Sequence, residues 1–94
     1  MSKEEIKVSA CVVTYNQERY IAECLQSLVD QDTNFNFEVI VSDDCSTDRT
    51  PEIIKDFQRR YPDIIKPILH EKNIGALKNF IFVQKAIKQN EIER

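Results

Sequence analysis

The feature that most constrains this chain is an apolar run that ends in two adjacent aspartates. Glu38–Val41 is short, apolar and β-branched, which is typical of a strand buried on both faces of a parallel sheet. Asp43 and Asp44 follow at the end where the loops of open α/β sheets separate and ligands bind. Taken alone, such a pair is more often a turn and cap than a binding site. A helix with Pro51 in its first turn comes next, and three side chains suit its cap: Ser46, Asp48 and Thr50.

The same pattern, an apolar run followed by polar residues and a helix, occurs earlier in the chain. Val8–Val13 is a second apolar run, Thr14-Tyr15-Asn16 closes it, and a helical period begins near Glu18. Because a strand, a helix and a parallel strand form a right-handed crossover, the two runs are expected side by side in one sheet. Their polar ends then meet at one edge of that sheet. The apolar stripe of the intervening helix consists of Ile21, Cys24, Leu25, Leu28 and Val29.

A third unit completes the predicted sheet. The helix after Asp48 stops before Pro62, and Ile64–Leu69 then has the composition of a strand. Pro67 cannot donate to a strand ladder, so this strand is expected at an edge. His70 has no cysteine or second histidine beside it to share a metal, which favours a structural or solvent-facing role. The pattern predicts one α/β domain with three layers and a Rossmann-like parallel sheet in the order 3-2-1.

A turn and a long helix close the chain. Gly75 is the only glycine, and we expect it to adopt a positive φ or to allow close approach of a ligand. The helix is predicted from Ala76 to about Gln89, with additional apolar surface at Phe82 and Val83, so it expects cover on two sides. Its main apolar face is predicted to contain Leu77, Phe80, Ile81 and Ile87.

Composition narrows the class of protein. The 94 residues suffice for one small domain, 41% are hydrophobic and 31% charged, and the net charge of −3 disfavours a nucleic-acid partner. Residues 1–6 are polar and expected to be disordered. Neither a signal peptide nor a membrane span is predicted, which indicates a cytoplasmic protein. The odd number of dispersed cysteines indicates reduced thiols, and Cys45 is interpreted as a turn residue.

Three motifs together resemble one enzyme family. They are VVTYNQERYIAECLQSLVDQ at residues 12–31, FEVIVSDDCSTDRTPEII at 37–54 and EKNIGALKN at 71–79. In this order and near this spacing, the chain resembles the family 2 glycosyltransferases, which are inverting enzymes of the GT-A fold in polysaccharide biosynthesis that use nucleotide sugars. The resemblance covers nearly the whole chain. It implies the nucleotide-binding front half of such a domain, with a donor that is expected to be a UDP-sugar and an acceptor that is a glycan or another molecule.

The resemblance also assigns roles to single residues. It places Asp44 against the N3–H of uracil, Tyr15 near the base and Glu18 within reach of the nucleoside. Lys78 stands where the family often has arginine and would offset diphosphate charge, although a lysine lacks the bidentate fork. Val13 replaces the family's usual proline. The same motifs add further positions to the expected nucleotide site: Thr14, Asn16, Asp43, Asn73 and Gly75.

The chain departs from the family pattern after its third helix. The family's Asp-x-Asp metal motif and its catalytic base come later than this sequence extends, so no catalytic or metal-binding residue is assigned. Manganese or magnesium is expected only for a full-length family domain. We therefore predict that these 94 residues alone do not transfer sugar.

Two other functions remain open from the sequence. A phosphoacceptor receiver domain would carry its acidic pair after the first strand and an aspartate after the third, but Thr14-Tyr15-Asn16 and His70 occupy those places. A catalytically silent interaction domain is compatible with the missing motifs. Dinucleotide binding is disfavoured because a single glycine cannot form G-x-G-x-x-G. If the first strand has no outer neighbour, its open edge and the Phe80–Val83 surface favour a homodimer.

Overall fold

The computed structural model describes residues 6–92, in which three strands alternate with three helices. The expected disorder of residues 1–6 concerns positions outside this range, apart from Ile6, which begins the first strand. No helix among the described residues has both the length and the apolar character needed to cross a membrane. The elements are β1 (Ile6–Thr14), α1 (Ile21–Val29), β2 (Asn36–Asp43), α2 (Thr50–Arg60), β3 (Ile65–Leu69) and α3 (Ala76–Lys88).

The three strands form one parallel sheet in the order β1-β2-β3, which confirms the predicted order. Val41 in the middle strand is paired with Val12 on one side and with Pro67 on the other. Pro67 therefore lies on an edge strand, where its missing N–H leaves no ladder bond unmade. The strands also extend beyond the apolar runs, because Ser42 and Asp43 continue the register at the carboxyl end of β2.

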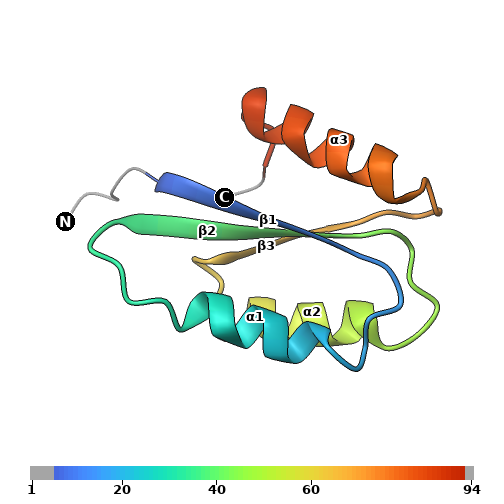
Figure 1. Cartoon of the computed structure of the whole chain (residues 1–94), viewed down its shortest axis with the longest axis horizontal. Helices are drawn as coiled ribbons and strands as arrows, with labels where there is room; N and C mark the ends of the chain where they lie inside the picture. Colours follow the sequence, from blue (N-terminus) through green and yellow to red (C-terminus); the bar gives the residue numbers. More distant parts are fainter. Residues whose placement is uncertain (1–5, 93–94) are drawn as a thin grey trace.

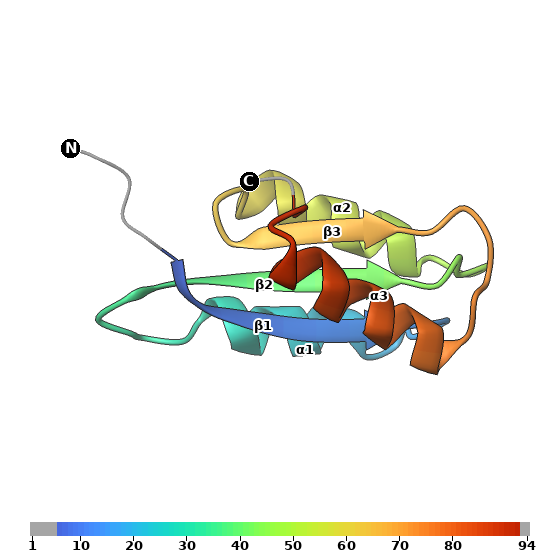
Figure 2. The ribbon, with the colours of Figure 1, turned by 90° about the horizontal axis from the view of Figure 1, so that it is seen from above.

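Helices cover both faces of this sheet. Figure 1 shows α1 and α2 on one face and α3 alone on the other, and Figure 2 shows α3 crossing above the strands. Because side chains alternate along β2, Val39 and Val41 point toward α1 and α2, whereas Ile40 points toward α3. The larger core lies under α1 and α2 and contains Ile21, Leu25, Val39, Val41, Ile54, Phe57 and Ile65. The smaller core lies under α3 and contains Ile40, Val83, Ala86 and Ile92.

The rotation of α3 about its axis differs from the prediction. Three residues of the predicted apolar face are exposed, at 71% for Leu77, 45% for Phe80 and 42% for Ile81, whereas the fourth, Ile87, packs against the smaller core. The buried face instead carries Asn79, Val83 and Ala86. Apolar residues surround this helix, so hydrophobicity alone does not fix its rotation. The buried hydrogen bonds of Asn79 to β2 fix it, because these bonds form only with the amide turned toward the sheet.

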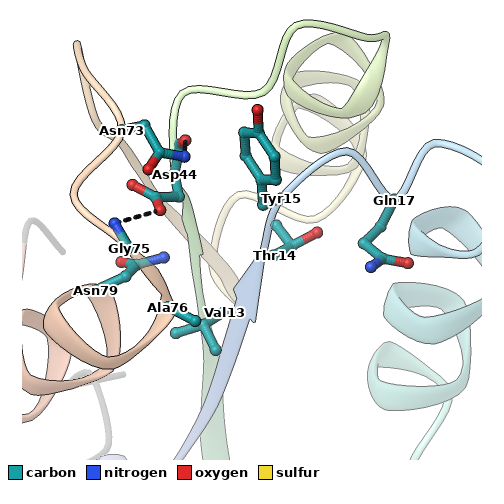
Figure 3. A pocket seen from close by; sticks show the side chains of 9 residues that line it. All are labelled: Val13, Thr14, Tyr15, Gln17, Asp44, Asn73, Gly75, Ala76 and Asn79. Carbon is teal, nitrogen blue, oxygen red and sulfur yellow. Dashed lines mark hydrogen bonds between the residues drawn. The ribbon is translucent and has the colours of Figure 1, made fainter.

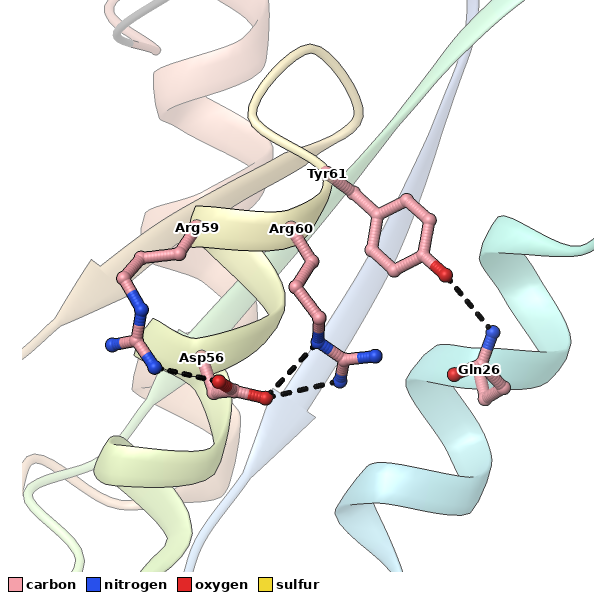
Figure 4. A network of polar contacts seen from close by, with 5 residues as sticks. All are labelled: Gln26, Asp56, Arg59, Arg60 and Tyr61. Atoms are coloured by element: carbon pink, nitrogen blue, oxygen red, sulfur yellow. Dashed lines mark hydrogen bonds and ion pairs between the residues drawn. The ribbon is translucent and has the colours of Figure 1, made fainter.

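The two helices on the shared face also contact each other through polar groups. Gln26 of α1 donates to the Tyr61 hydroxyl at 3.3 Å, just past the end of α2. Asp56 forms ion pairs with Arg59 at 2.6 Å and with Arg60 at 3.1 Å (Figure 4). The one basic dipeptide of the chain is thus paired with an acid on its own helix. Such exposed pairs contribute little to stability, so the apolar core carries the packing of this face.

The three cysteines are free thiols. Burial raises the pKa of Cys11 on β1, and a hydrogen bond with Gln84 of α3 partly opposes that rise. Cys45 has a φ of 61° in the turn after β2. The left-handed conformation is unusual for a side chain with a Cβ. It agrees with the interpretation of Cys45 as a turn residue.

Candidate functional site

A cavity of about 460 Å³ lies between the carboxyl ends of β1 and β2 and the start of α3. Figure 3 shows Asn73, Asp44, Gly75 and Asn79 grouped together, Thr14 and Tyr15 at the end of β1, and Gln17 apart from them beside α1. The cavity brings together six residues of the predicted site: Val13, Thr14, Tyr15, Asp44, Asn73 and Gly75. Three further lining residues were not predicted: Gln17, Ala76 and Asn79. All three lie within the motifs at residues 12–31 and 71–79, but the sequence assigned them no role at the site.

Asp44 joins the end of β2 to the loop before α3. Its side chain is only 2% exposed, and its two oxygens accept the backbone N–H groups of Ile74 at 2.7 Å and Gly75 at 2.8 Å. The Asn73 amide donates to the Asp44 carbonyl at 3.1 Å. An ionised carboxylate has about four acceptor positions, so each oxygen keeps a further lone pair. Asp44 therefore offers the cavity a fixed acceptor.

Gly75 supplies the backbone shape that makes this arrangement possible. Its φ of 92° and ψ of 151° lie in a region that is essentially restricted to glycine. A Cβ added there would meet no atom within 4 Å, so the requirement comes from the backbone and not from crowding. The positive φ expected from the sequence is present.

Thr14 carries the one buried side-chain oxygen or nitrogen without a hydrogen-bond partner in the described part of the chain. Its residue is 6% exposed and ends β1 directly beside the cavity. The Thr14 carbonyl accepts the Asp44 N–H at 3.0 Å, so only the Thr14 hydroxyl lacks a hydrogen-bond partner. Because buried polar groups are normally paired, this hydroxyl marks a place where a further group is expected.

Two predicted site residues instead connect the loops after β1 and β2. Asn16 accepts the Thr47 N–H at 2.8 Å, and its own N–H donates to the Ser46 hydroxyl at 2.8 Å. Glu18 accepts the Arg49 N–H at 2.9 Å, at the start of α2. Neither Asn16 nor Glu18 lines the cavity. Glu18 was expected to begin the helix that follows it, but that helix begins at Ile21, and the carboxylate lies at the amino end of α2 instead.

Asp48 completes the connection between these loops. It accepts the N–H of Thr50, the first residue of α2, at 2.9 Å and the N–H of Glu18 at 3.2 Å, whereas the N-cap residue of α2 is Arg49, which makes no side-chain cap bond. Desolvation acts to raise the pKa of Asp48, but its hydrogen bonds with Thr50 and Glu18 outweigh that effect and hold the pKa below the ordinary value. The contact between the loops after β1 and β2 thus includes an ionised carboxylate, that of Asp48.

The remaining predicted residues lie outside the cavity. Asp43 accepts the N–H of Ser46 at 2.9 Å and also its hydroxyl, which closes the turn after β2. Lys78 is exposed in the first turn of α3 and is absent from the lining. Asp43 therefore has the geometry of a turn residue, whereas Asp44, its neighbour, faces the cavity.

A buried polar network lies beneath the start of α3. The Asn79 side-chain oxygen accepts the Ser42 hydroxyl at 2.5 Å and is 3.0 Å from His70 Nε2, and the Asn79 amide donates to the Ser42 carbonyl at 3.0 Å. His70 Nε2 also lies 3.2 Å from the Ser42 hydroxyl, so the three side chains form one network. His70 also packs edge-on against Phe82, with ring centroids 4.8 Å apart. As the sequence indicated, His70 has a structural role.

The acidic pair does not have the arrangement of a metal site. Among residues 6–92 no three side chains of histidine, cysteine, aspartate or glutamate are grouped closely enough to hold a metal ion. The carboxylates of Asp43 and Asp44 are directed at Ser46 and at the backbone of residues 74 and 75. The two carboxylates thus serve separate structural contacts, and the described residues offer no grouped set of ligands for a divalent cation.

Comparison with known families decides the relationship of the chain. The sequence profile of glycosyl transferase family 2 matches residues 9–89. The chain belongs to this family. Its relatives include the uncharacterised protein Rv1520 of Mycobacterium tuberculosis, which is 46% identical over 81 residues that make up 86% of this chain and 23% of the relative.

Solved structures of glycosyltransferases share the fold. Staphylococcus aureus TarS in complex with UDP is 39% identical and has a TM-score of 0.70, over 86% of this chain and 24% of the TarS chain. The mannosyltransferase PcManGT of Pyrobaculum calidifontis, in complex with GDP-Man and Mn²⁺, has a TM-score of 0.72 at 22% identity, over 89% and 27% of the two chains. The family 2 portion seen here thus spans about a quarter of these two solved chains, of which the TarS chain comprises residues 1–349, and 14% of a longer solved TarS chain. The GT-A expectation for the fold is confirmed.

Proposed function

We propose that this chain is the nucleotide-binding portion of a glycosyltransferase that takes a UDP-sugar as donor and a saccharide or related molecule as acceptor. The cavity at the ends of β1 and β2, with Asp44 as its buried acceptor, is the observation that carries the proposal. The 39% identity to TarS, which was solved with UDP, supports it over most of the chain. Enzymes of this family transfer sugars from nucleotide sugars, and a site of this kind would bind the nucleotide of the donor.

The chemistry of the cavity fits a uracil nucleoside. Uracil presents an N–H between two carbonyl groups, and the ionised Asp44 accepts such a donor but repels an acceptor. Tyr15 is 44% exposed at the rim, where its ring offers a face for stacking on a base. The unpaired hydroxyl of Thr14 gains a partner if a ligand or an ordered water enters.

Turnover requires groups beyond those described. We infer that manganese or magnesium serves the longer family domain and that these 94 residues bind a nucleotide with little dependence on either ion. Without electrostatic stabilisation of the departing diphosphate, no sugar transfer is expected, since such stabilisation supplies much of the rate enhancement in this kind of reaction. The three free thiols fit a reducing compartment, which supports a cytoplasmic location.

Titration calorimetry with UDP tests the proposal. Wild type should bind UDP weakly, both with and without magnesium. Asp44→Asn keeps the shape of the side chain but removes its charge. A hydrogen bond to a charged group contributes about 1.5–3 kcal/mol, so the substitution should weaken binding by about 10- to 150-fold. Glu71→Gln, which removes an exposed charge from the nearby loop, is the matched control. Equal affinities of wild type and Asp44→Asn would exclude Asp44 from the site.

A silent interaction domain is the second candidate, and the surface of α3 favours it. Leu77, Phe80, Ile81 and Phe82 are all substantially exposed, and Val13 is 37% exposed at the end of β1. β1 pairs only with β2, so its outer edge presents backbone groups without a strand partner among the described residues. We infer that this edge and this helix face are covered by another chain, with a second copy of the protein as the first candidate.

A further inference from the structure

Asn79 stands out among the cavity residues because it is buried, polar and absent from the motif roles considered above. It is 1% exposed, which makes it one of the two most buried polar side chains of the lining, together with Asp44. Gly75 connects the two, because its N–H donates to Asp44 at 2.8 Å and its carbonyl accepts the Asn79 N–H at 2.9 Å. That second bond is made by the backbone N–H of Asn79, and the side chains of Asp44 and Asn79 both line the same cavity.

The orientation of this amide is fixed by its neighbours. The Ser42 carbonyl accepts one of the two amide hydrogens, the Ser42 hydroxyl donates to the Asn79 oxygen, and His70 Nε2 lies 3.0 Å from that oxygen. A rotated amide would place its oxygen against the Ser42 carbonyl, which accepts only, and a buried group would lose its hydrogen bond. In Figure 3 the amide nitrogen lies on the side of the strand end that carries Val13 and Thr14, whereas the oxygen contacts Ser42 and His70. The side that faces the cavity is thus a donor.

One hydrogen of this amide remains for a ligand. The Asn79 nitrogen has two donors, and within residues 6–92 only the Ser42 carbonyl accepts one of them. We propose that the second hydrogen is donated to the 4-carbonyl of the bound base, so that Asn79 is a specificity-determining residue and Ser42 and His70 are its positioning residues. This inference rests on the proposed binding of a uracil nucleotide.

The order of hydrogen-bond donors and acceptors on uracil selects the 4-carbonyl as the partner of Asn79. The edge of uracil that lies farthest from the ribose carries N3–H and the 4-carbonyl, so this edge enters the floor of the cavity first. Asp44 accepts from N3–H, and Asn79 donates to the adjacent oxygen. Cytosine carries an acceptor at N3 and an amino group at position 4, which reverses both contacts. A floor with one fixed acceptor and one fixed donor therefore discriminates between the two bases, and part of that discrimination belongs to Asn79.

The test changes the ligand first, so that it does not depend on the stability of a variant. Wild-type protein is titrated with UDP, with 4-thio-UDP and with 2-thio-UDP, because sulfur accepts hydrogen bonds more weakly than oxygen. Loss of one neutral hydrogen bond should weaken 4-thio-UDP by about fivefold relative to UDP, whereas 2-thio-UDP, the matched control, should bind like UDP. Equal affinities for UDP and 4-thio-UDP would overturn the role of Asn79 and leave the proposed function standing.

Asn79→Leu then links the effect to the residue. The variant should bind UDP about fivefold more weakly and should no longer distinguish UDP from 4-thio-UDP. A purely structural role would lower both affinities equally and preserve their ratio, which would overturn the inference. Absence of UDP binding by the wild type would overturn the proposed function and this inference together.

Discussion

The carboxylate of Asp44 and the backbone N–H of Gly75 are joined at 2.8 Å, which connects the first residue after β2 to the N-cap residue of α3. The two groups are 31 residues apart in the sequence. Their contact closes the floor of the cavity and orients the first turn of the helix above it. Consequently the acceptor that we assign to the nucleotide is also a structural anchor of the fold.

Replacement of Gly75 should destabilise the protein through its backbone alone. Gly75→Ala adds a methyl group that meets no neighbouring atom, but at a φ of 92° the new residue is strained. Such strain costs about 1–3 kcal/mol, and relaxing it would withdraw the N–H from Asp44. Urea unfolding measures the change in free energy. Glu71→Ala, an exposed substitution in the same loop, should stay within about 0.5 kcal/mol of wild type. Equal stabilities of Gly75→Ala and wild type would show that the loop adopts another conformation.

The contact between the loops after β1 and β2 should respond to loss of Asn16. Asn16→Ala leaves the Thr47 N–H, which lies before the start of α2, without its acceptor. Loss of a comparable capping interaction costs about 0.5–2 kcal/mol, and we expect the unfolding free energy to fall within that range. Asn34→Ala, in the exposed loop between α1 and β2, is the matched control. If both variants unfold alike, the contact does not contribute to stability.

Asp48 should make the protein sensitive to acid. Its pKa in the folded state lies below the ordinary value of 3.8, because its hydrogen bonds with Thr50 and Glu18 outweigh desolvation. The folded state therefore binds a proton less readily than the unfolded state, so the stabilisation is complete above the ordinary pKa and is lost as the pH falls through the folded pKa. Asp48→Asn should flatten this part of the stability curve. Thermal melts from neutral pH to below 3.8 measure it, and parallel curves for the two proteins would contradict the assignment.

Self-association should follow from the open edge of β1 and the exposed face of α3. We expect a dimer or larger species by light scattering at roughly tens of micromolar, a range in which exposed strands and apolar surface associate. Phe80→Lys places a charge in the apolar surface and should shift the population toward monomer. Lys85→Ala, on the same helix, is the control. A wild-type protein that is monomeric under these conditions would contradict the proposed second copy.

The sequence by itself determined the architecture. Three apolar runs separated by helical periods allow only parallel strands with crossover helices, and Pro67 assigned β3 to an edge because it cannot donate to a ladder. The one glycine also identified the turn that needs a positive φ, since φ is a local property of the residue. The carboxyl ends of β1 and β2 were expected at one edge for the same topological reason, and four of the residues predicted there, Val13, Thr14, Tyr15 and Asp44, line one cavity.

Tertiary structure decided the helix rotation and the hydrogen-bond partners that the local sequence patterns left undetermined. The apolar residues around α3 permit several rotations, and only the bonds of Asn79 to Ser42 and His70 select the observed one. Asn16 and Glu18 were predicted at the nucleotide, yet their acceptors meet backbone N–H groups about thirty residues away, in a loop whose position depends on the whole βαβ unit. Hydrogen-bond partners that are distant in sequence are set by the packing of the strands, and sequence periodicity contains no information about them.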